Sequence, residues 1–144
     1  MIIYKFGGAS VKDVAGVKNL ARILLSRGEA GVVVLSALGK TTNQLEELVG
    51  YIYKHDRVNF KRQLNDIRQY HEKIMDGLFP GNHPVYKQVN RMFLRMEKAF
   101  EEQWKDYDFL YDQVVSLGEL LSTQVVAHYL VHQGISCRYA DITH

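Results

Sequence analysis

Near its amino end the chain reads Lys5-Phe6-Gly7-Gly8-Ala9-Ser10-Val11, directly after the apolar residues 1–4. This order predicts a short strand that ends in a cation, two glycines and a hydroxyl, followed by a helix from about Lys12. Paired glycines let backbone N–H groups approach an anion, and a helix amino terminus adds partial positive charge. A neighbouring lysine supplies a mobile point charge. The run therefore indicates phosphate chemistry, although it lacks the downstream glycines of a Walker A loop or a dinucleotide fingerprint.

The segments that follow predict an α/β fold. Residues 31–36 form a continuous apolar, β-branched run, typical of a strand covered on both faces of a parallel sheet. The helix between the two strands is expected to end at Arg27-Gly28, because glycine commonly follows the carboxyl end of a helix. Strand, helix and strand make a βαβ unit, and its crossover should be right-handed. A third strand is predicted over residues 136–141.

The middle of the chain predicts almost continuous helix. The first of these helices is expected to be capped by Thr41 or Thr42. The later ones are expected over about 57–78, 85–104 and 116–133, with a break at 79–84 that holds both prolines. The fold class we predict is therefore a helix-rich α/β fold with a small parallel sheet that stops after its third strand. We interpret the chain as the amino-terminal piece of a longer protein.

Composition limits the classes of function. The 144 residues suggest one domain, and a formal net charge of +2 gives no reason to expect nucleic acid or an anionic membrane as a partner. The single cysteine, Cys137, fits a reducing, cytoplasmic location. The longest uninterrupted apolar run, residues 31–35, is too short to cross a membrane.

Three loops could carry chemistry, and they lie at residues 5–10, 36–43 and 116–122. Because carboxyl ends of parallel strands bind ligands in open α/β sheets, the first two loops should lie side by side. The third is expected to place Glu119, beside Gly118, in the first turn of an apolar helix. Each loop alone also fits a plainer role: a tight turn, a helix cap, or a charge that complements a helix dipole.

A metal site is a further possibility at His128 and His132, which are one helical turn apart. No glutamate follows His128 in an HExxH arrangement, and no cysteine cluster accompanies the pair. We therefore predict ordinary packing or solvated histidines here, and no metal site.

Taken together, the three motifs resemble the amino-terminal part of aspartate kinases (aspartokinases), members of the amino acid kinase superfamily. The match rests on residues 5–11, on 33–37 continuing to Thr41-Thr42-Asn43, and on 116–122, in the order found in the family. Sister kinases that act on acetylglutamate, carbamate or uridylate share the glycine loop, but not the run at 5–11 together with the later Gly-Glu-Leu block. Ala9 departs from the family, which usually has threonine there, so one hydroxyl near the phosphate is missing while the backbone donors remain.

The resemblance implies a three-layer amino acid kinase-like fold and transfer of the γ-phosphoryl group of ATP, with Mg²⁺, to the side-chain carboxylate of L-aspartate. The product is 4-phospho-L-aspartate, the first intermediate toward lysine, threonine and methionine. By the family's motifs, the phosphate and ATP site would comprise Lys5 as the catalytic cation with Gly7, Gly8 and Ser10. The aspartate site would comprise Ser36, Thr42, Asn43 and Glu119, with Glu119 pairing with the α-ammonium group.

The resemblance also implies that residues 1–144 are the aspartate-binding part of a kinase domain that continues beyond them, followed by regulatory ACT domains. The family suggests a homodimer for the full protein. We expect the chain alone to lack measurable kinase activity. The alternative is a non-catalytic module of the same fold that acts in protein–protein association.

Overall fold

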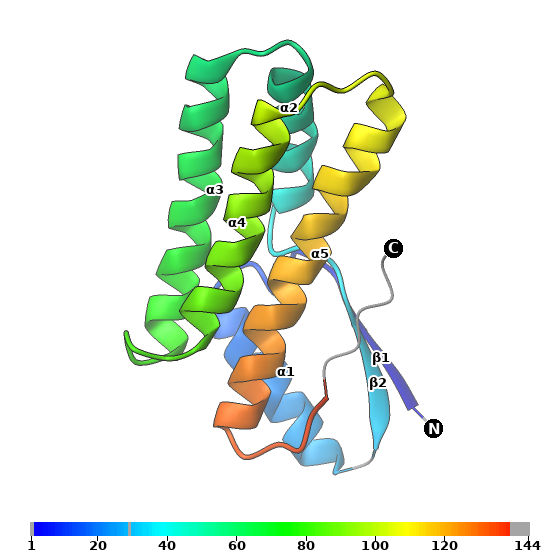
Figure 1. Cartoon of the computed structure of the whole chain (residues 1–144). Coiled ribbons are helices and arrows are strands. Elements are labelled where there is room, and N and C mark those ends of the chain that lie inside the picture. Colours follow the sequence, from blue (N-terminus) through cyan, green and yellow to red (C-terminus); the bar gives the residue numbers. More distant parts are fainter. Residues whose placement is uncertain (1, 29, 139–144) are drawn as a thin grey trace.

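The computed structural model describes residues 2–28 and 30–138. The elements follow in the order β1 (Ile2–Phe6), α1 (Val14–Arg27), β2 (Gly31–Leu35), α2 (Thr41–Tyr53), α3 (Arg57–Leu78), α4 (Val85–Glu101) and α5 (Tyr107–His132). Figure 1 shows α2 to α5 as a bundle of long helices, with α1 behind the lower half of α5 and the sheet to one side of the bundle. The predicted helix-rich α/β fold is confirmed.

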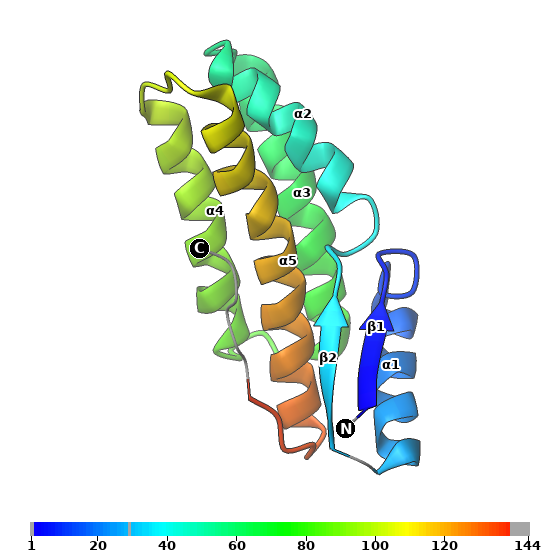
Figure 2. The same cartoon turned by 90° about the vertical axis from the view of Figure 1, so that its right-hand side faces the viewer.

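The two strands pair in parallel, in a register that runs from Ile2↔Gly31 to Phe6↔Leu35. The connecting helix α1 starts at the cap Asp13 and ends at Gly28, which has a left-handed backbone (φ 64°). That conformation suits glycine because it has no Cβ. The βαβ unit predicted from the sequence is therefore confirmed, and Figure 2 shows the helices behind both strands.

The two faces of the sheet differ in their surroundings. Phe6 and Leu35 pack against the helical core. On the opposite face, Ile3 is 63% exposed, and Val32 and Val34 are each 46% exposed. The expectation that residues 31–36 are covered on both faces is therefore not met by the residues that the structure describes.

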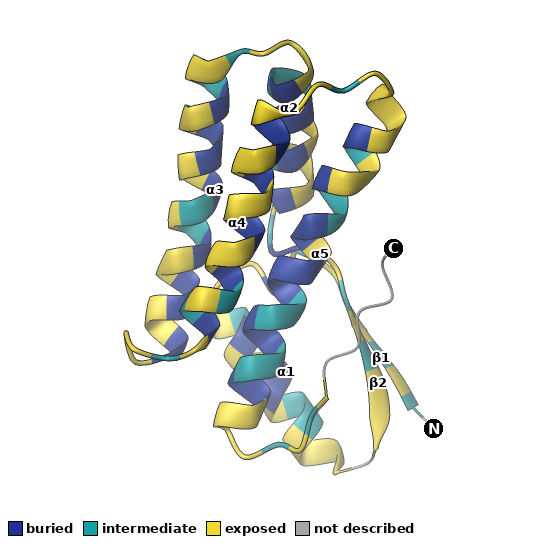
Figure 3. Cartoon of the chain, viewed as in Figure 1, coloured by how far each residue is buried: buried dark blue, intermediate teal, exposed yellow. Residues whose placement is uncertain are grey.

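The core lies between the helices, and their exposed residues face outward (Figure 3). Helix α5 is long and apolar enough in composition to cross a membrane. More than half of its most apolar stretch, 56%, is buried within the protein. Burial in the bundle thus accounts for much of its apolar character, as in core helices of soluble proteins.

Two sequence predictions need correction. Residues 136–138 form no strand, and the rest of the predicted third strand, 139–141, lies outside the described residues. The last helix begins at Tyr107 and not at Ser116. Asp106 explains this earlier start, because its Oδ1 accepts from the backbone N–H groups of Asp108 (3.0 Å) and Phe109 (3.2 Å) and so caps the helix.

The fully buried His71 of α3 should make stability depend on pH. Its Nδ1 bonds the carbonyl of Ile67 (2.8 Å), its Nε2 has no partner among the described residues, and burial lowers its pKa from 6.5 to about 4. Between those values the unfolded chain binds more protons, so stability should fall as pH drops from about 6.5 to 4, by about 3 kcal/mol. Urea unfolding of the wild type and His71→Leu at several pH values tests this. Equal pH slopes in both proteins would contradict it.

Candidate functional site

The loops after β1 and β2 leave the same edge of the sheet and are bonded to each other. Ser36 N donates to the carbonyl of Phe6 (3.1 Å), and Gly39 N donates to the carbonyl of Gly8 (3.1 Å). Figure 2 shows both loops beyond the arrowheads of the strands. The predicted juxtaposition of residues 5–10 and 36–43 is therefore correct. It follows from parallel pairing, because parallel strands place their carboxyl ends together.

The two glycines of the first loop have different roles. A Cβ on Gly8 would lie 2.6 Å from the carbonyl oxygen of Gly39 and 2.9 Å from that of Ala37, whereas a Cβ on Gly7 would meet nothing within 4 Å. Gly8 therefore permits the close packing of the two loops, and Gly7 is exposed. In the described part of the chain, the N–H groups of Gly7, Gly8 and Ala9 donate to no protein acceptor. Three free donors therefore lie at this edge.

The amino end of α1 is not free to serve an anion in the way that the sequence suggested. Residues 8–11 form a turn, in which Ser10 N donates to the carbonyl of Gly7 (3.0 Å). The helix starts only at Val14, and the Oδ1 of its cap Asp13 accepts from Gly16 N (2.8 Å). A carboxylate thus already occupies the positive end of α1. An anion at Gly7 and Gly8 would depend on the loop donors and on Lys5.

Lys5 lies on the open face of the sheet. It is exposed, alternates with the inward-facing Tyr4 and Phe6, and pairs in register with Val34. Its side chain therefore belongs to the same face as Ile3 and Val34, one residue before the end of β1.

The amino end of α2 differs from that of α1 in being open. Thr41 is fully buried and its hydroxyl donates to the carbonyl of Leu38 (2.6 Å), while the cap position is held by Lys40 without a side-chain bond. The prediction that Thr41 or Thr42 caps this helix is therefore wrong. Thr42 and Asn43 are exposed in its first turn, and within the described ranges their N–H groups have no protein acceptor. Such a helix end favours an anion.

Glu119 lies in the middle of α5 and not in its first turn, so the predicted helix-terminal position is wrong. It is exposed, and the hydroxyls of Ser122 (3.0 Å) and Thr123 (2.7 Å) donate to its backbone carbonyl. The preceding Gly118 explains where it lies, because a Cβ there would be 2.9 Å from Leu45 Cδ1 and 3.1 Å from Ala37 Cβ. Glu119 therefore follows the point where α5 touches the second loop.

Tyr70 of α3 is a site residue that the sequence analysis missed. Its hydroxyl donates to the carbonyl of Lys12, and a Cβ on Gly39 would lie 3.1 Å from its Cζ. Burial, with a smaller effect of Asp13, raises the pKa of Tyr70, so the hydroxyl stays a donor at neutral pH. The side chain therefore lies against Gly39 of the second loop and against Lys12, in the segment that joins the first loop to α1. No spacing in the sequence links it to either loop.

The structure thus brings together the segments that carry all eight predicted site residues. Gly8 is half-buried and the other seven are exposed, namely Lys5, Gly7, Ser10, Ser36, Thr42, Asn43 and Glu119. Residues 2–28 and 30–138 contain no cluster of three histidine, cysteine or acidic side chains that could hold a metal ion. What the arrangement offers is one cation, several backbone donors and one carboxylate. These groups can bind an anion beside a cationic group.

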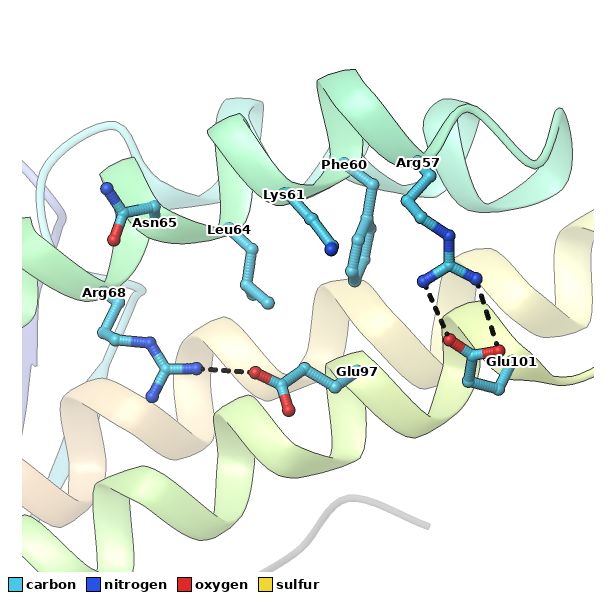
Figure 4. Close-up of a pocket in the computed structure, with 8 residues that line it drawn as sticks. All are labelled: Arg57, Phe60, Lys61, Leu64, Asn65, Arg68, Glu97 and Glu101. Atoms are coloured by element: carbon cyan, nitrogen blue, oxygen red, sulfur yellow. Dashed lines mark hydrogen bonds and ion pairs between the residues drawn. The ribbon is translucent and has the colours of Figure 1, made fainter.

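A hollow lies elsewhere, between α3 and α4, with a volume of about 420 Å³ (Figure 4). Arg57 pairs with Glu101 (3.1 Å) and Arg68 with Glu97 (2.9 Å) across it, and the arginines stack on Phe100 and Phe93 respectively. Exposed ion pairs of this kind contribute up to about 1 kcal/mol each. The groove contains none of the predicted site residues, and we interpret its pairs as links between two helices.

Comparison with known proteins identifies relatives over the whole chain. A family model described as "Amino acid kinase family" matches residues 1–144. Aspartokinase 2, chloroplastic, of Arabidopsis thaliana is 30% identical over 153 residues, which cover 96% of this chain and 26% of that protein. Lysine-sensitive aspartokinase 3 of Escherichia coli is 28% identical, over 99% of this chain and 31% of that protein.

Solved structures agree with these relatives. E. coli aspartokinase III in complex with aspartate and ADP matches with a TM-score of 0.75 and 30% identity, over 93% of this chain and 29% of that chain. The same enzyme in complex with lysine and aspartate matches with a TM-score of 0.77 and 29% identity, over 94% of this chain and 30% of that chain. The chain therefore spans between a quarter and a third of the length of these proteins.

Proposed function

This chain belongs to the amino acid kinase family, and from that premise we propose that it is the amino-terminal, aspartate-binding part of an ATP-dependent aspartate kinase. The enzyme would transfer the γ-phosphoryl group of ATP to the side-chain carboxylate of L-aspartate and form 4-phospho-L-aspartate, the first step toward lysine, threonine and methionine. The observation that carries the proposal is the convergence of the three motif segments at one edge of the sheet.

The phosphate half of the site would use the first loop. Lys5 would neutralise charge on the phosphoryl group in transfer, and the free N–H of Gly8, with that of Gly7, would donate to its oxygens. Ser10 would add a hydroxyl close by. Phosphoryl transfer depends mainly on positioning and charge neutralisation, and these groups supply both. Mg²⁺ would arrive with the phosphates of ATP, which are its usual partners.

The aspartate half would use the second loop and α5. The open amino end of α2 supports binding of a carboxylate by Thr42 and Asn43, with Ser36 at the end of β2. Glu119 would pair with the α-ammonium group of the substrate. Its exposure and its place beside the second loop support that role.

The remainder of the site would come from other parts of the protein. The chain covers 26% of one curated relative, and the sheet face with Ile3, Val32 and Val34 is exposed. We propose that later residues of a kinase domain cover this face and complete the ATP site, in a cytoplasmic homodimer. The chain alone would then be inactive. A non-catalytic module that associates through its surface is the second candidate, and the same exposed apolar residues favour it.

Glu119→Gln in a full-length protein that contains this chain tests the aspartate site. The substitution keeps the shape of the side chain and removes its charge, so we expect the KM for aspartate to rise about tenfold or more, since hydrogen-bonded charge pairs contribute about 1.5–3 kcal/mol. The KM for ATP should change little. Asp112→Asn, an exposed carboxylate two turns earlier on α5, is the matched control. Unchanged kinetics of Glu119→Gln would remove Glu119 from the substrate site.

A further inference from the structure

Three histidines gather far from the motif segments, where the turn between α3 and α4 meets the last turns of α5. The ring centroid of His83 lies 5.6 Å from that of His128 and 5.6 Å from that of His132, with the rings nearly perpendicular in both pairs. Phe79 packs on His83 (4.4 Å) and near His132 (5.9 Å). The sequence showed only the pair on α5. We call His83, His128 and His132 the histidine cluster.

His83 has a bond that fixes the tautomer of its neutral ring. Its Nδ1 accepts from the backbone N–H of Val85 (3.0 Å), in the first turn of α4, where the cap Pro84 makes no side-chain bond. An accepting Nδ1 carries no proton, so in the neutral ring the proton is on Nε2. Coordination of a metal by Nε2 would require that proton to move to Nδ1, which would break the bond to Val85. The described residues also contain no set of three side chains that could hold a metal.

We propose that the histidine cluster is a proton-sensitive link between the α3–α4 turn and the carboxyl end of α5. When the rings are neutral, His83 bonds the start of α4 and packs edge-on against both histidines of α5. Protonation at Nδ1 replaces the acceptor with a donor that faces the N–H of Val85. It also places a positive charge 5.6 Å, between ring centroids, from each of the two imidazoles of α5. Both effects loosen the turn from α5.

The surroundings of the histidine cluster favour the neutral form of His83. Burial is the largest cause that lowers the pKa of His83, and the neighbouring His128 and His132 lower it further. Burial also lowers the pKa of His128. On α3 and α4, the nearby Asp76 and Tyr86 bond each other (2.7 Å), and no carboxylate contributes to the shift of His83. Histidines with lowered pKa values stabilise the fold above their ordinary pKa of 6.5, and this stabilisation is lost as pH falls below it.

Amide hydrogen exchange of the Val85 N–H, corrected for the intrinsic rate at each pH, tests the proposal on the 144-residue chain. We expect its protection to fall about tenfold between about pH 7.5 and 5.5 in the wild type, because protonation of His83 removes the acceptor of this N–H. In His83→Asn the side-chain oxygen can still accept but cannot be protonated, so protection should stay constant. The N–H of Phe109, capped by the carboxylate of Asp106, is the internal control.

A second variant distinguishes an effect of the histidine cluster from an effect of low pH on the whole protein. His128→Gln/His132→Gln should shift the loss of Val85 protection to higher pH, because His83 then lacks the two neighbours that oppose its protonation. The proposal is overturned if Val85 protection in the wild type is independent of pH, or if it falls equally in His83→Asn. It is also overturned if the double variant leaves the midpoint unchanged.

Discussion

Gly8→Ala is expected to lower the free energy of unfolding by about 2–4 kcal/mol, because an added methyl group at a tightly packed site forces its neighbours to move. The added Cβ would lie 2.6 and 2.9 Å from two backbone carbonyl oxygens, of Gly39 and Ala37. These oxygens belong to main chain and cannot turn away as a flexible side chain could. Relief would require the two loops to separate, which would break the bond from Gly39 N to the carbonyl of Gly8. Urea unfolding monitored by circular dichroism measures the effect.

Gly7→Ala is the matched control for this experiment. A Cβ at Gly7 meets nothing within 4 Å, so its free energy of unfolding should stay within about 0.5 kcal/mol of the wild type. A Gly8→Ala protein as stable as Gly7→Ala would show that the two loops are not packed together as described. The comparison therefore tests the loop packing on which the proposed site depends, without any assay of activity.

Lys5→Met in a full-length protein that contains this chain is expected to lower kcat about 10²–10³-fold, the usual effect of removing one group that stabilises charge in the transition state. The exposed side chain leaves the core unchanged, so stability should be close to that of the wild type. The KM for aspartate should change little, which distinguishes this variant from Glu119→Gln. Steady-state release of ADP in the presence of aspartate measures these values.

Two controls accompany the Lys5 experiment. Lys18→Met removes an exposed lysine on α1, outside the proposed site, and should leave kcat unchanged. The 144-residue chain alone is the blank, and aspartate-dependent release of ADP by it would contradict the proposal that other residues complete the site. Full activity of Lys5→Met would remove Lys5 from catalysis. A wild-type full-length protein with no aspartate-dependent release of ADP would favour the non-catalytic candidate.

Much of the fold could be predicted because its signals are local. The glycine run, the β-branched strand and the Gly28 terminus lie close together along the chain, and they specify the βαβ unit by spacing alone. The last helix was predicted to start too late, although the Asp106 cap and the apolar positions Leu110, Val114 and Leu117 were a readable signal. Glu119 was therefore assigned to a helix end, whereas it lies at the contact between α5 and the second loop.

The sequence by itself determined the order of the elements, the three motifs and the family they resemble, because residue type and spacing set local backbone preference. Only the tertiary structure separated Gly8, which lies against two carbonyls, from Gly7, which has open space. Only the tertiary structure brought Tyr70 to Lys12 and His83 to the pair on α5. These contacts join residues far apart in the chain, and they depend on how the helices pack. The spacing of residues along the sequence does not predict that packing.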